Sequence, residues 1–288
     1  MEQKPITVAN INEMLTWKPR RMKLEDEWRN ALHEPTGTYQ DWSLVLPFCE
    51  ILKNAFESMC SVRSIGLRVS QSGRCYTFFP DKTDLDTVRE FLSKVGSYIV
   101  LRDCLALSFA LDYDRIKGNP NNPQTVIGKL RSRAKPYQRD TSGDTYDAAN
   151  EMVSHCMDFI REMTCYQDIT CVVAVPPSDP QKPFNLPRYL ASEIGKALKI
   201  SDRSPGVQTV KARESLRGTD NKKKLSTIEG TISVDPTALR NQVVLLIDDL
   251  YQSGVSMNYT AMLLLKAGAK RIYGLACEKT CTNDDNIR

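Results

Sequence analysis

Residues 243–256 read Val-Val-Leu-Leu-Ile-Asp-Asp-Leu-Tyr-Gln-Ser-Gly-Val-Ser, and this stretch decides both the fold and the site. The unbroken aliphatic run over residues 243–247 predicts a strand buried on both faces, as in a parallel sheet. Two adjacent acids follow at the expected tip of the strand, and a small polar turn comes next. Beyond the turn, apolar residues recur at helical spacing up to a glycine that is expected to stop the helix: Met257, Ala261, Leu264, Leu265 and then Gly268.

The strand, the polar loop and the helix start together predict a phosphate cradle. Backbone N–H groups at such a turn, with the helix dipole behind them, favour an anion. The carboxylates of Asp248 and Asp249 can accept hydrogen bonds from vicinal sugar hydroxyls and lie near a metal ion. The alternative is a surface turn that closes an ordinary strand-to-helix unit with two solvated acids. Neither the P-loop pattern nor the G-x-G-x-x-G pattern occurs in the chain, so these two nucleotide-binding motifs are disfavoured.

The composition is typical of a globular protein, with 41% hydrophobic and 26% charged residues among 288. A formal net charge of +4 is only mildly basic and neither favours nor excludes nucleic acid as a partner. No apolar run approaches the about 20 residues of a membrane span, and the first residues lack a signal-peptide core. Nine scattered cysteines without a C-x-x-C pair favour reduced thiols. We therefore expect a cytoplasmic protein with no membrane segment.

Strands alternate with helices through the last two thirds of the chain. A second buried strand over residues 169–175 ends at Pro176 and Pro177, and a helix is expected to begin after Asn185, a suitable N-cap. This alternation predicts a parallel, doubly wound sheet, whose ligands sit at the carboxyl ends of the strands. The other expected elements are a helix over residues 144–163 and strands over residues 206–211, 231–234 and 271–277.

The first third of the chain contains no constellation with evident chemistry. Residues 1 to about 60 are expected to be helical with interruptions. Alternating polarity over residues 64–79 predicts a β-hairpin. A short helix over residues 84–95 and an extended apolar segment over residues 98–111 are expected to follow.

Two basic segments are candidates for phosphate contacts. Residues 129–139 carry five basic side chains, which bind phosphate or nucleic acid or else form a solvated helix face. Nucleic acid is the weaker candidate, because no aromatic platform interleaves the charges. Residues 213–229 are polar and are expected to form a mobile loop that includes Lys222, Lys223 and Lys224.

The stretch over residues 243–256 resembles the diphosphoribose-binding signature of type I phosphoribosyltransferases, in which an aliphatic strand and two acids precede Thr/Ser-Gly-x-Thr/Ser. Residues 134–137, 173–176, 184–185 and 248–254 also resemble, in the same order, motifs of the ComF-type branch of that family. The resemblance covers residues 96–288, and only the final motif is individually specific. The cysteine-rich zinc module of that branch is missing here, so residues 1–95 are something else.

The resemblance implies a fold, a ligand and a set of site residues. The implied fold is a parallel doubly wound sheet with a flexible hood over residues 213–224, which closes over the sugar and excludes water. The implied ligand is phosphoribosyl pyrophosphate with Mg²⁺. Asp248 and Asp249 are the implied catalytic residues, and they contact the metal indirectly, through ligand or water. The implied ligand-binding residues are Asp248, Asp249, Leu250, Tyr251, Gln252, Ser253, Gly254, Val255, Ser256, Pro176, Pro177, Lys182, Arg213 and Arg217.

Three functions remain open at this point. The first is a transferase that moves the phosphoribosyl group to an acceptor and releases pyrophosphate. The second is a non-catalytic sensor or regulatory subunit that binds phosphoribosyl pyrophosphate or a nucleotide, and the third is a nucleotide-degrading effector. Gln252 replaces the acid that serves as a base in purine-salvage relatives, and an amide does not titrate, so hypoxanthine-type salvage is disfavoured.

The chain is expected to divide near residue 95. Residues 1–95 are predicted to form an α+β accessory domain that contacts a protein partner or oligomerises, because they carry many apolar side chains. Residues 96–288 are predicted to form the phosphoribosyltransferase-like domain. A simple extension of the core sheet is the alternative for the first segment.

Overall fold

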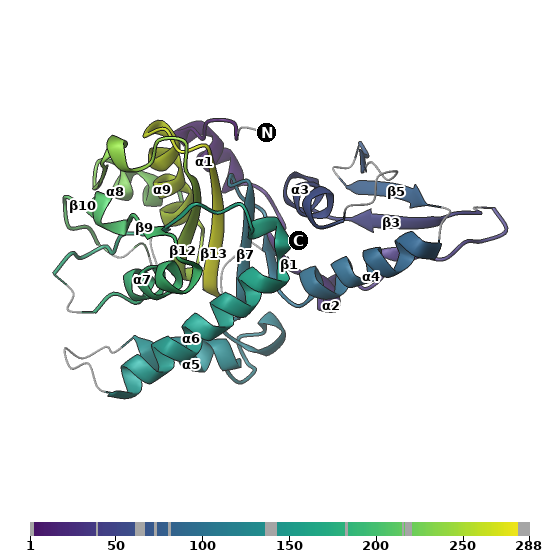
Figure 1. The fold of residues 1–288 in the computed structure, drawn as a ribbon, viewed down its shortest axis with the longest axis horizontal. Helices are drawn as coiled ribbons and strands as arrows, with labels where there is room; N and C mark the ends of the chain where they lie inside the picture. The colour runs from purple at the N-terminus through teal and green to yellow at the C-terminus, as the bar shows by residue number, and fades with distance from the viewer. Residues whose placement is uncertain are drawn as a thin grey trace.

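The structure is a computed structural model, and it describes residues 3–38, 40–60, 67–71, 74–79, 82–135, 143–181, 184–214, 216 and 221–281. Figure 1 shows a large sheet with helices on both faces and a smaller lobe that extends to one side. No helix among the described residues is long and apolar enough to cross a membrane.

The large sheet has seven strands, and most of them are parallel. The five strands from β7 to β9 in the sheet order pair in parallel, while β1 and β6 add to one edge in antiparallel fashion. The predicted α/β class with a mostly parallel sheet is therefore confirmed. In sheet order the strands are β1 (Arg21–Lys23), β6 (Ile99–Leu101), β7 (Leu107–Tyr113), β13 (Arg271–Lys279), β12 (Val243–Tyr251), β8 (Cys171–Ala174) and β9 (Ser201–Asp202).

Residues 243–247 form the buried centre of this sheet, as predicted. All five side chains are buried, and each contributes about 1.5–3 kcal/mol by leaving water. Leu245 and Ile247 pack in the cluster that includes residues of α5 (Val126–Ala134), α6 (Gly143–Glu162) and α7 (Leu186–Leu198). Val244 and Leu246 pack on the opposite face, in the cluster that includes residues of α1 (Val8–Met14), α8 (Asn221–Ile228) and α9 (Val255–Lys266) (Figure 1).

The order of the strands creates a topological switch point between β8 and β12. From β8 the chain passes through α7 to β9, outward on one side of the sheet. From β12 it passes through α9 to β13, on the other face and in the other direction. The loops that follow β8 and β12 therefore diverge, and this is where open α/β sheets bind their ligands.

Local signals in the sequence set the ends of the helices. Asn185 caps α7 by accepting a hydrogen bond from the Arg188 N–H at 3.0 Å, which confirms the predicted start. Gly268 follows α9 with a φ of +94°, and it ends the helix as predicted. The observed span of α6 also agrees with the predicted helix over residues 144–163.

In the small lobe, the described residues form a four-stranded antiparallel sheet and three helices. The described part of residues 64–79 forms the predicted hairpin, in which β4 pairs with β5. The sheet order is β2 (Leu32–His33), β3 (Trp42–Leu46), β5 (Cys75–Phe79) and β4 (Arg68–Val69), and the helices are α2 (Leu24–Glu27), α3 (Cys49–Met59) and α4 (Lys82–Gly96).

Residues 1–60 were predicted to be helical with interruptions, but the structure has three short strands there, β1, β2 and β3, so the prediction is wrong at these positions. Leu44 and Leu46 in β3 are fully buried on alternate positions, so the period is two and not that of a helix. Strand β1 also lies within residues 1–95 but pairs with β6 in the large sheet. The division of the chain at residue 95 stays a prediction.

The loop predicted over residues 213–229 is wrong in its second half, where α8 forms. Leu225 and Ile228 are buried three positions apart on this helix, and Lys224 beside them is also buried. The predicted strands near residues 206–211 and 231–234 exist as β10 (Val207–Thr209) and β11 (Ile232–Val234), but they pair with each other in a separate sheet. Short 3₁₀ turns complete the chain at Ile116–Gly118, Thr164–Tyr166, Ser204–Gly206 and Pro236–Ala238.

Candidate functional site

The two adjacent acids lie inside β12. The prediction that they lie at the tip of the strand is therefore wrong. The strand continues to Tyr251, and Asp248 pairs in register with Ala276 of β13. Because side chains alternate along a strand, Asp249 continues the face of Ile247 toward α5, and Asp248 points to the other face. The two carboxylates therefore have different surroundings.

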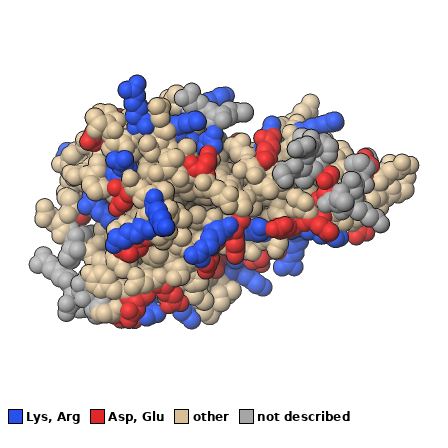
Figure 2. All heavy atoms as spheres, in the orientation of Figure 1, with Lys and Arg blue, Asp and Glu red and all other residues tan. Residues whose placement is uncertain are grey.

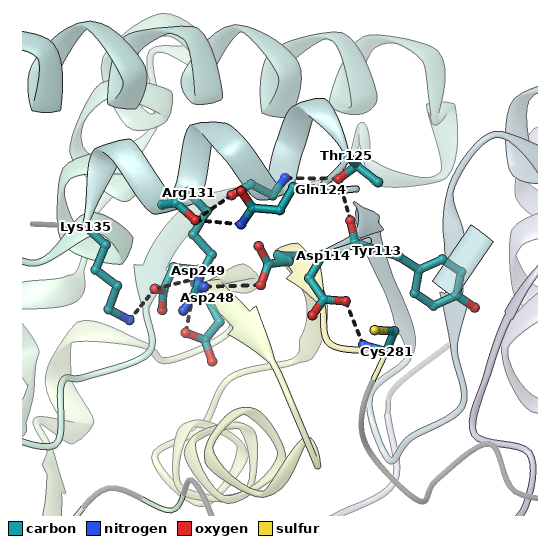
Figure 3. Close-up of polar contacts among 12 residues, drawn as sticks. Tyr113, Asp114, Gln124, Thr125, Arg131, Lys135, Asp248, Asp249 and Cys281 are labelled. Carbon is teal, nitrogen blue, oxygen red and sulfur yellow. Dashed lines mark hydrogen bonds and ion pairs between the residues drawn. The ribbon is translucent and has the colours of Figure 1, made fainter. Parts of the chain in front are cut away.

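Asp249 is held by two cations, Arg131 within α5 and Lys135 directly after it (Figure 3). Its Oδ2 accepts hydrogen bonds from Lys135 Nζ at 2.5 Å and from Arg131 Nε at 3.3 Å. Burial works to raise the pKa of this carboxyl, but Lys135 and Arg131 outweigh burial and lower it. Asp249 is therefore ionised and engaged within the protein.

Asp248 has the opposite electrostatic character. Burial and the neighbouring charge of Asp249 raise the pKa of its carboxyl well above the usual range. Its Oδ1 accepts a hydrogen bond from the Asp249 N–H at 2.9 Å. Arg213 lies close enough for the charge of Asp248 to favour its cationic form, although burial lowers the pKa of that guanidinium overall. Asp248 is half-buried and is the more accessible carboxylate of the pair.

Glu278 is a further acid at this edge that the sequence reading missed. It lies on β13 opposite Leu250, and its carboxylate accepts a hydrogen bond from Arg131 Nη1 at 3.1 Å. Burial raises the pKa of Glu278 to about 7, and the charge of Arg131 opposes that rise. An acid directly after the apolar run over residues 272–277 was the available signal, because neighbouring parallel strands end at the same edge.

Three residues of the basic cluster predicted over residues 129–139 are paired with acids. Arg131 and Lys135 bind the acids of β12 and β13, and Arg133 pairs with Asp144 at the start of α6. Figure 2 shows basic and acidic side chains mixed over the described part of one face. The predicted phosphate and nucleic-acid contacts of this cluster stay predictions.

The loop after β12 depends on Gly254, which has a φ of +79°. A Cβ at this position would lie 2.5 Å from Cζ of Tyr251 and nearer still to the hydroxyl oxygen of that residue. The Tyr251 ring is buried under the loop, and its hydroxyl donates a hydrogen bond to Asp103 Oδ2 at 3.1 Å. Only glycine therefore fits between the buried ring and the start of α9.

The start of α9 presents backbone amides without a side-chain cap among the described residues. Gly254 is the N-cap residue, and its carbonyl accepts hydrogen bonds from the N–H and from Nδ2 of Asn258, both at 2.9 Å. The first N–H groups of a helix have no partner within the helix and carry its positive dipole end. The Val255 side chain is buried in the core, so this residue can offer a ligand only its N–H, whereas Ser256 is half-buried.

The loop after β8 lies against the segment that carries Arg213. The Pro177 carbonyl accepts hydrogen bonds from the Thr209 hydroxyl at 2.5 Å and from Arg213 Nη1 at 3.3 Å. The Arg213 N–H donates to the Ser178 carbonyl at 3.1 Å. Of the predicted site residues, Pro177 and Arg213 are thus joined by a hydrogen bond, and the charge of Asp248 acts on Arg213. Lys182 and Arg217 lie outside the described residues.

Two buried cations behind the loop were also missed by the sequence reading. Lys279 donates a hydrogen bond to the Gln252 carbonyl, and Arg20 donates one to the Ser253 carbonyl. Arg20 lies 233 positions from Ser253, so no local pattern indicates this contact.

The acids at this edge do not form a metal cage among the described residues, where no group of three or more His, Cys, Asp or Glu side chains can hold an ion. Asp249 is paired with Arg131 and Lys135, so Asp248 is the member of the pair whose carboxyl group could bind a metal, once it has lost its proton.

Comparisons with known proteins do not assign the chain to a family. No family model matches it, and a search of curated proteins finds no match. The functional argument therefore depends on the site and on the sequence resemblance.

Proposed function

We propose that this chain is a phosphoribosyltransferase-type protein. It binds phosphoribosyl pyrophosphate with Mg²⁺ and transfers the phosphoribosyl group with release of pyrophosphate. The observation that carries the proposal is the junction of β12 and α9 at the topological switch point, where Asp248 precedes a glycine-dependent loop and a helix start without a side-chain cap. The same order of parts forms the phosphorylated-ribose site in the family that the sequence resembles.

Each part of the site has a role in this proposal. Backbone N–H groups from Ser253 to Ser256, together with the Ser256 hydroxyl, bind the 5-phosphate of the ribose. The half-buried Asp248 accepts hydrogen bonds from the sugar hydroxyls. Arg213, which donates a hydrogen bond to the Pro177 carbonyl and is acted on by the charge of Asp248, contacts the pyrophosphate group.

The donor set fits a Mg²⁺ ion that arrives with its ligand. Mg²⁺ keeps several waters and binds proteins through one or two carboxylates plus the phosphates of the substrate. Asp248 can supply one such carboxylate, directly or through a water molecule. The ion would offset the charge of the pyrophosphate group as it leaves.

In the transfer step, a nucleophile of the acceptor forms a bond to C1 of the ribose while the bond from C1 to the pyrophosphate oxygen breaks. Positive charge develops at the ribose ring, and Asp248 stabilises it in its ionised form, which a nearby Mg²⁺ ion would favour over the neutral form that burial favours. Asp249 can contribute to this stabilisation only after the Lys135 side chain has left its hydrogen bond with Asp249. The Lys135 side chain is 40% exposed, so solvent can receive its ammonium group.

A second candidate function is a sensor that binds the same ligand without chemistry. The ion pairs of Asp249 with Arg131 and Lys135 favour it, because one of the two implied catalytic carboxylates is already neutralised. Gln252 also lacks a titratable group that could act as a base toward an acceptor.

Calorimetry with phosphoribosyl pyrophosphate and Mg²⁺ tests both candidates. Asp248→Asn should weaken binding about ten- to a hundredfold, since a charge-assisted hydrogen bond contributes roughly 1.5–3 kcal/mol. Asp147→Asn on the exposed face of α6 is the matched control and should leave affinity unchanged. An absence of binding by the wild-type protein would contradict both functions. Binding without pyrophosphate release across a broad panel of acceptors would favour the sensor, and release that depends on one acceptor would favour the transferase.

A further inference from the structure

Two buried cations lie behind the loop that joins β12 to α9. Lys279 is fully buried, and its Nζ donates hydrogen bonds to the carbonyls of Gln252 and Thr280, both at 3.0 Å. Arg20 is 1% exposed, and its Nη1 donates to the Ser253 carbonyl at 2.9 Å. Two consecutive carbonyls of the loop are therefore bound by buried, positively charged side chains.

Both cations are fixed by the sheet and not by the loop. Lys279 is the last residue of β13, where it pairs in register with Tyr251 of β12 and with Tyr113 of β7. Its Nζ lies 5.8 Å from the centroid of the Tyr251 ring. Arg20 immediately precedes β1, and its carbonyl accepts a hydrogen bond from the Arg102 N–H at 2.8 Å. The anchors therefore belong to the rigid part of the fold.

Peptide geometry converts these contacts into a direction for the next N–H groups. In a trans peptide the C=O of one residue and the N–H of the following residue point in opposite directions. The Gln252 carbonyl faces Lys279, so the Ser253 N–H points away from it. The Ser253 carbonyl faces Arg20, so the Gly254 N–H also points away from a buried cation. These two N–H groups extend the row of amides at the start of α9.

We propose that Arg20 and Lys279 are positioning residues that orient the Ser253 and Gly254 amides toward a phosphate group. Neither side chain touches the ligand, and each acts through the carbonyl that it holds. The inference rests on the proposed function, in which the same loop binds the 5-phosphate of the ribose. It adds that the N-terminal segment of the chain takes part in binding, through Arg20.

The test uses the full-length protein labelled with ¹⁵N at serine and glycine, and inorganic phosphate as the probe. In the wild-type protein the amide resonances of Ser253 and Gly254 should shift as phosphate is added. Arg20→Met and Lys279→Met should each weaken the phosphate affinity measured from these shifts about tenfold, the equivalent of one lost hydrogen bond of about 1.4 kcal/mol. Arg20→Lys keeps a cationic donor and should recover most of the affinity.

Arg21→Met is the matched control. Arg21 is also buried and adjacent in sequence, and its Nη2 donates a hydrogen bond to the Cys281 carbonyl. It should leave the phosphate-induced shifts in place. Equal phosphate affinity in folded Arg20→Met, Lys279→Met and wild-type proteins would overturn the inference. Should the methionine variants fail to fold, the wild-type titration still decides, because shifts that exclude Ser253 and Gly254 would also overturn it.

This test separates the inference from the proposed function. Phosphate-induced shifts at Ser253 and Gly254 that weaken in both variants support the positioning role, even if phosphoribosyl pyrophosphate itself does not bind. Binding of phosphoribosyl pyrophosphate with equal affinity to wild type and both variants would support the proposed function and overturn the positioning role.

Discussion

Replacing Glu278 with glutamine is expected to remove a pH-dependent loss of stability. Burial raises the pKa of Glu278 from its ordinary 4.5 to about 7, even though Arg131 opposes the rise. Between these two values the folded protein binds a proton that the unfolded chain has already released. The stability contributed by that proton is complete below pH 4.5 and is lost as the pH rises through about 7.

The size of the loss follows from the difference between the two pKa values. The difference of 7 − 4.5 is 2.5, and one pKa unit corresponds to about 1.4 kcal/mol, so the full loss is about 3.5 kcal/mol. Glutamine has a similar shape and never ionises, so Glu278→Gln should not show this loss. Over the part of the titration between about pH 5 and pH 8, the variant should gain about 2–3 kcal/mol relative to the wild type.

Urea denaturation at several pH values measures this difference, because other titrating groups cancel between the two proteins. Glu57→Gln, which removes an exposed carboxyl from α3, is the matched control for the change of glutamate to glutamine. If the free-energy difference between Glu278→Gln and the wild type stays constant from pH 5 to pH 8, the reasoning about Glu278 is refuted.

Two further changes have defined outcomes. Gly254→Ala should cost about 1–3 kcal/mol of stability, measured by denaturation, because of the positive φ and the collision of the new Cβ with Tyr251. Gly37→Ala is its control and should cost less than about 0.5 kcal/mol, because a Cβ there would meet no atom of a non-neighbouring residue within 4 Å. Arg131→Met should cost about 3–5 kcal/mol because it leaves two buried carboxylates with a lost partner, while Lys135→Met, at a 40% exposed side chain, should cost no more than about 1 kcal/mol. Equal losses for Arg131→Met and Lys135→Met would contradict this assignment.

Local signals in the sequence were sufficient for the central part of the fold. The aliphatic run over residues 243–247 correctly predicted a buried strand, because both faces of a central parallel strand are buried. Asn185 and Gly268 marked helix ends because a cap and a positive φ are properties of one residue and its neighbours. These elements required no information from distant parts of the chain.

Other elements were missed where the decisive partner lies far away in the sequence. Strand β3 pairs with β5, and neither has more than five residues, so the apolar residues of β3 also suited a helix. In α8, the run of lysines before Leu225 suggested a solvated loop, but packing against α9 buries that residue. The engagement of Asp249 by Arg131 spans 118 positions and follows only from the folded arrangement.

The hydrogen bond from Arg20 to Ser253 can form only late in the synthesis of the chain. A chain leaves the ribosome from its N-terminus, and domains generally begin to fold as they emerge. Arg20 is made long before the loop that it binds, because 233 positions separate the two residues. Lys279, the other anchor, is made later than the loop. The loop that joins β12 to α9 therefore acquires both anchors only after β13 has been completed, so nascent chains that stop before this strand are expected to lack the Lys279 contact.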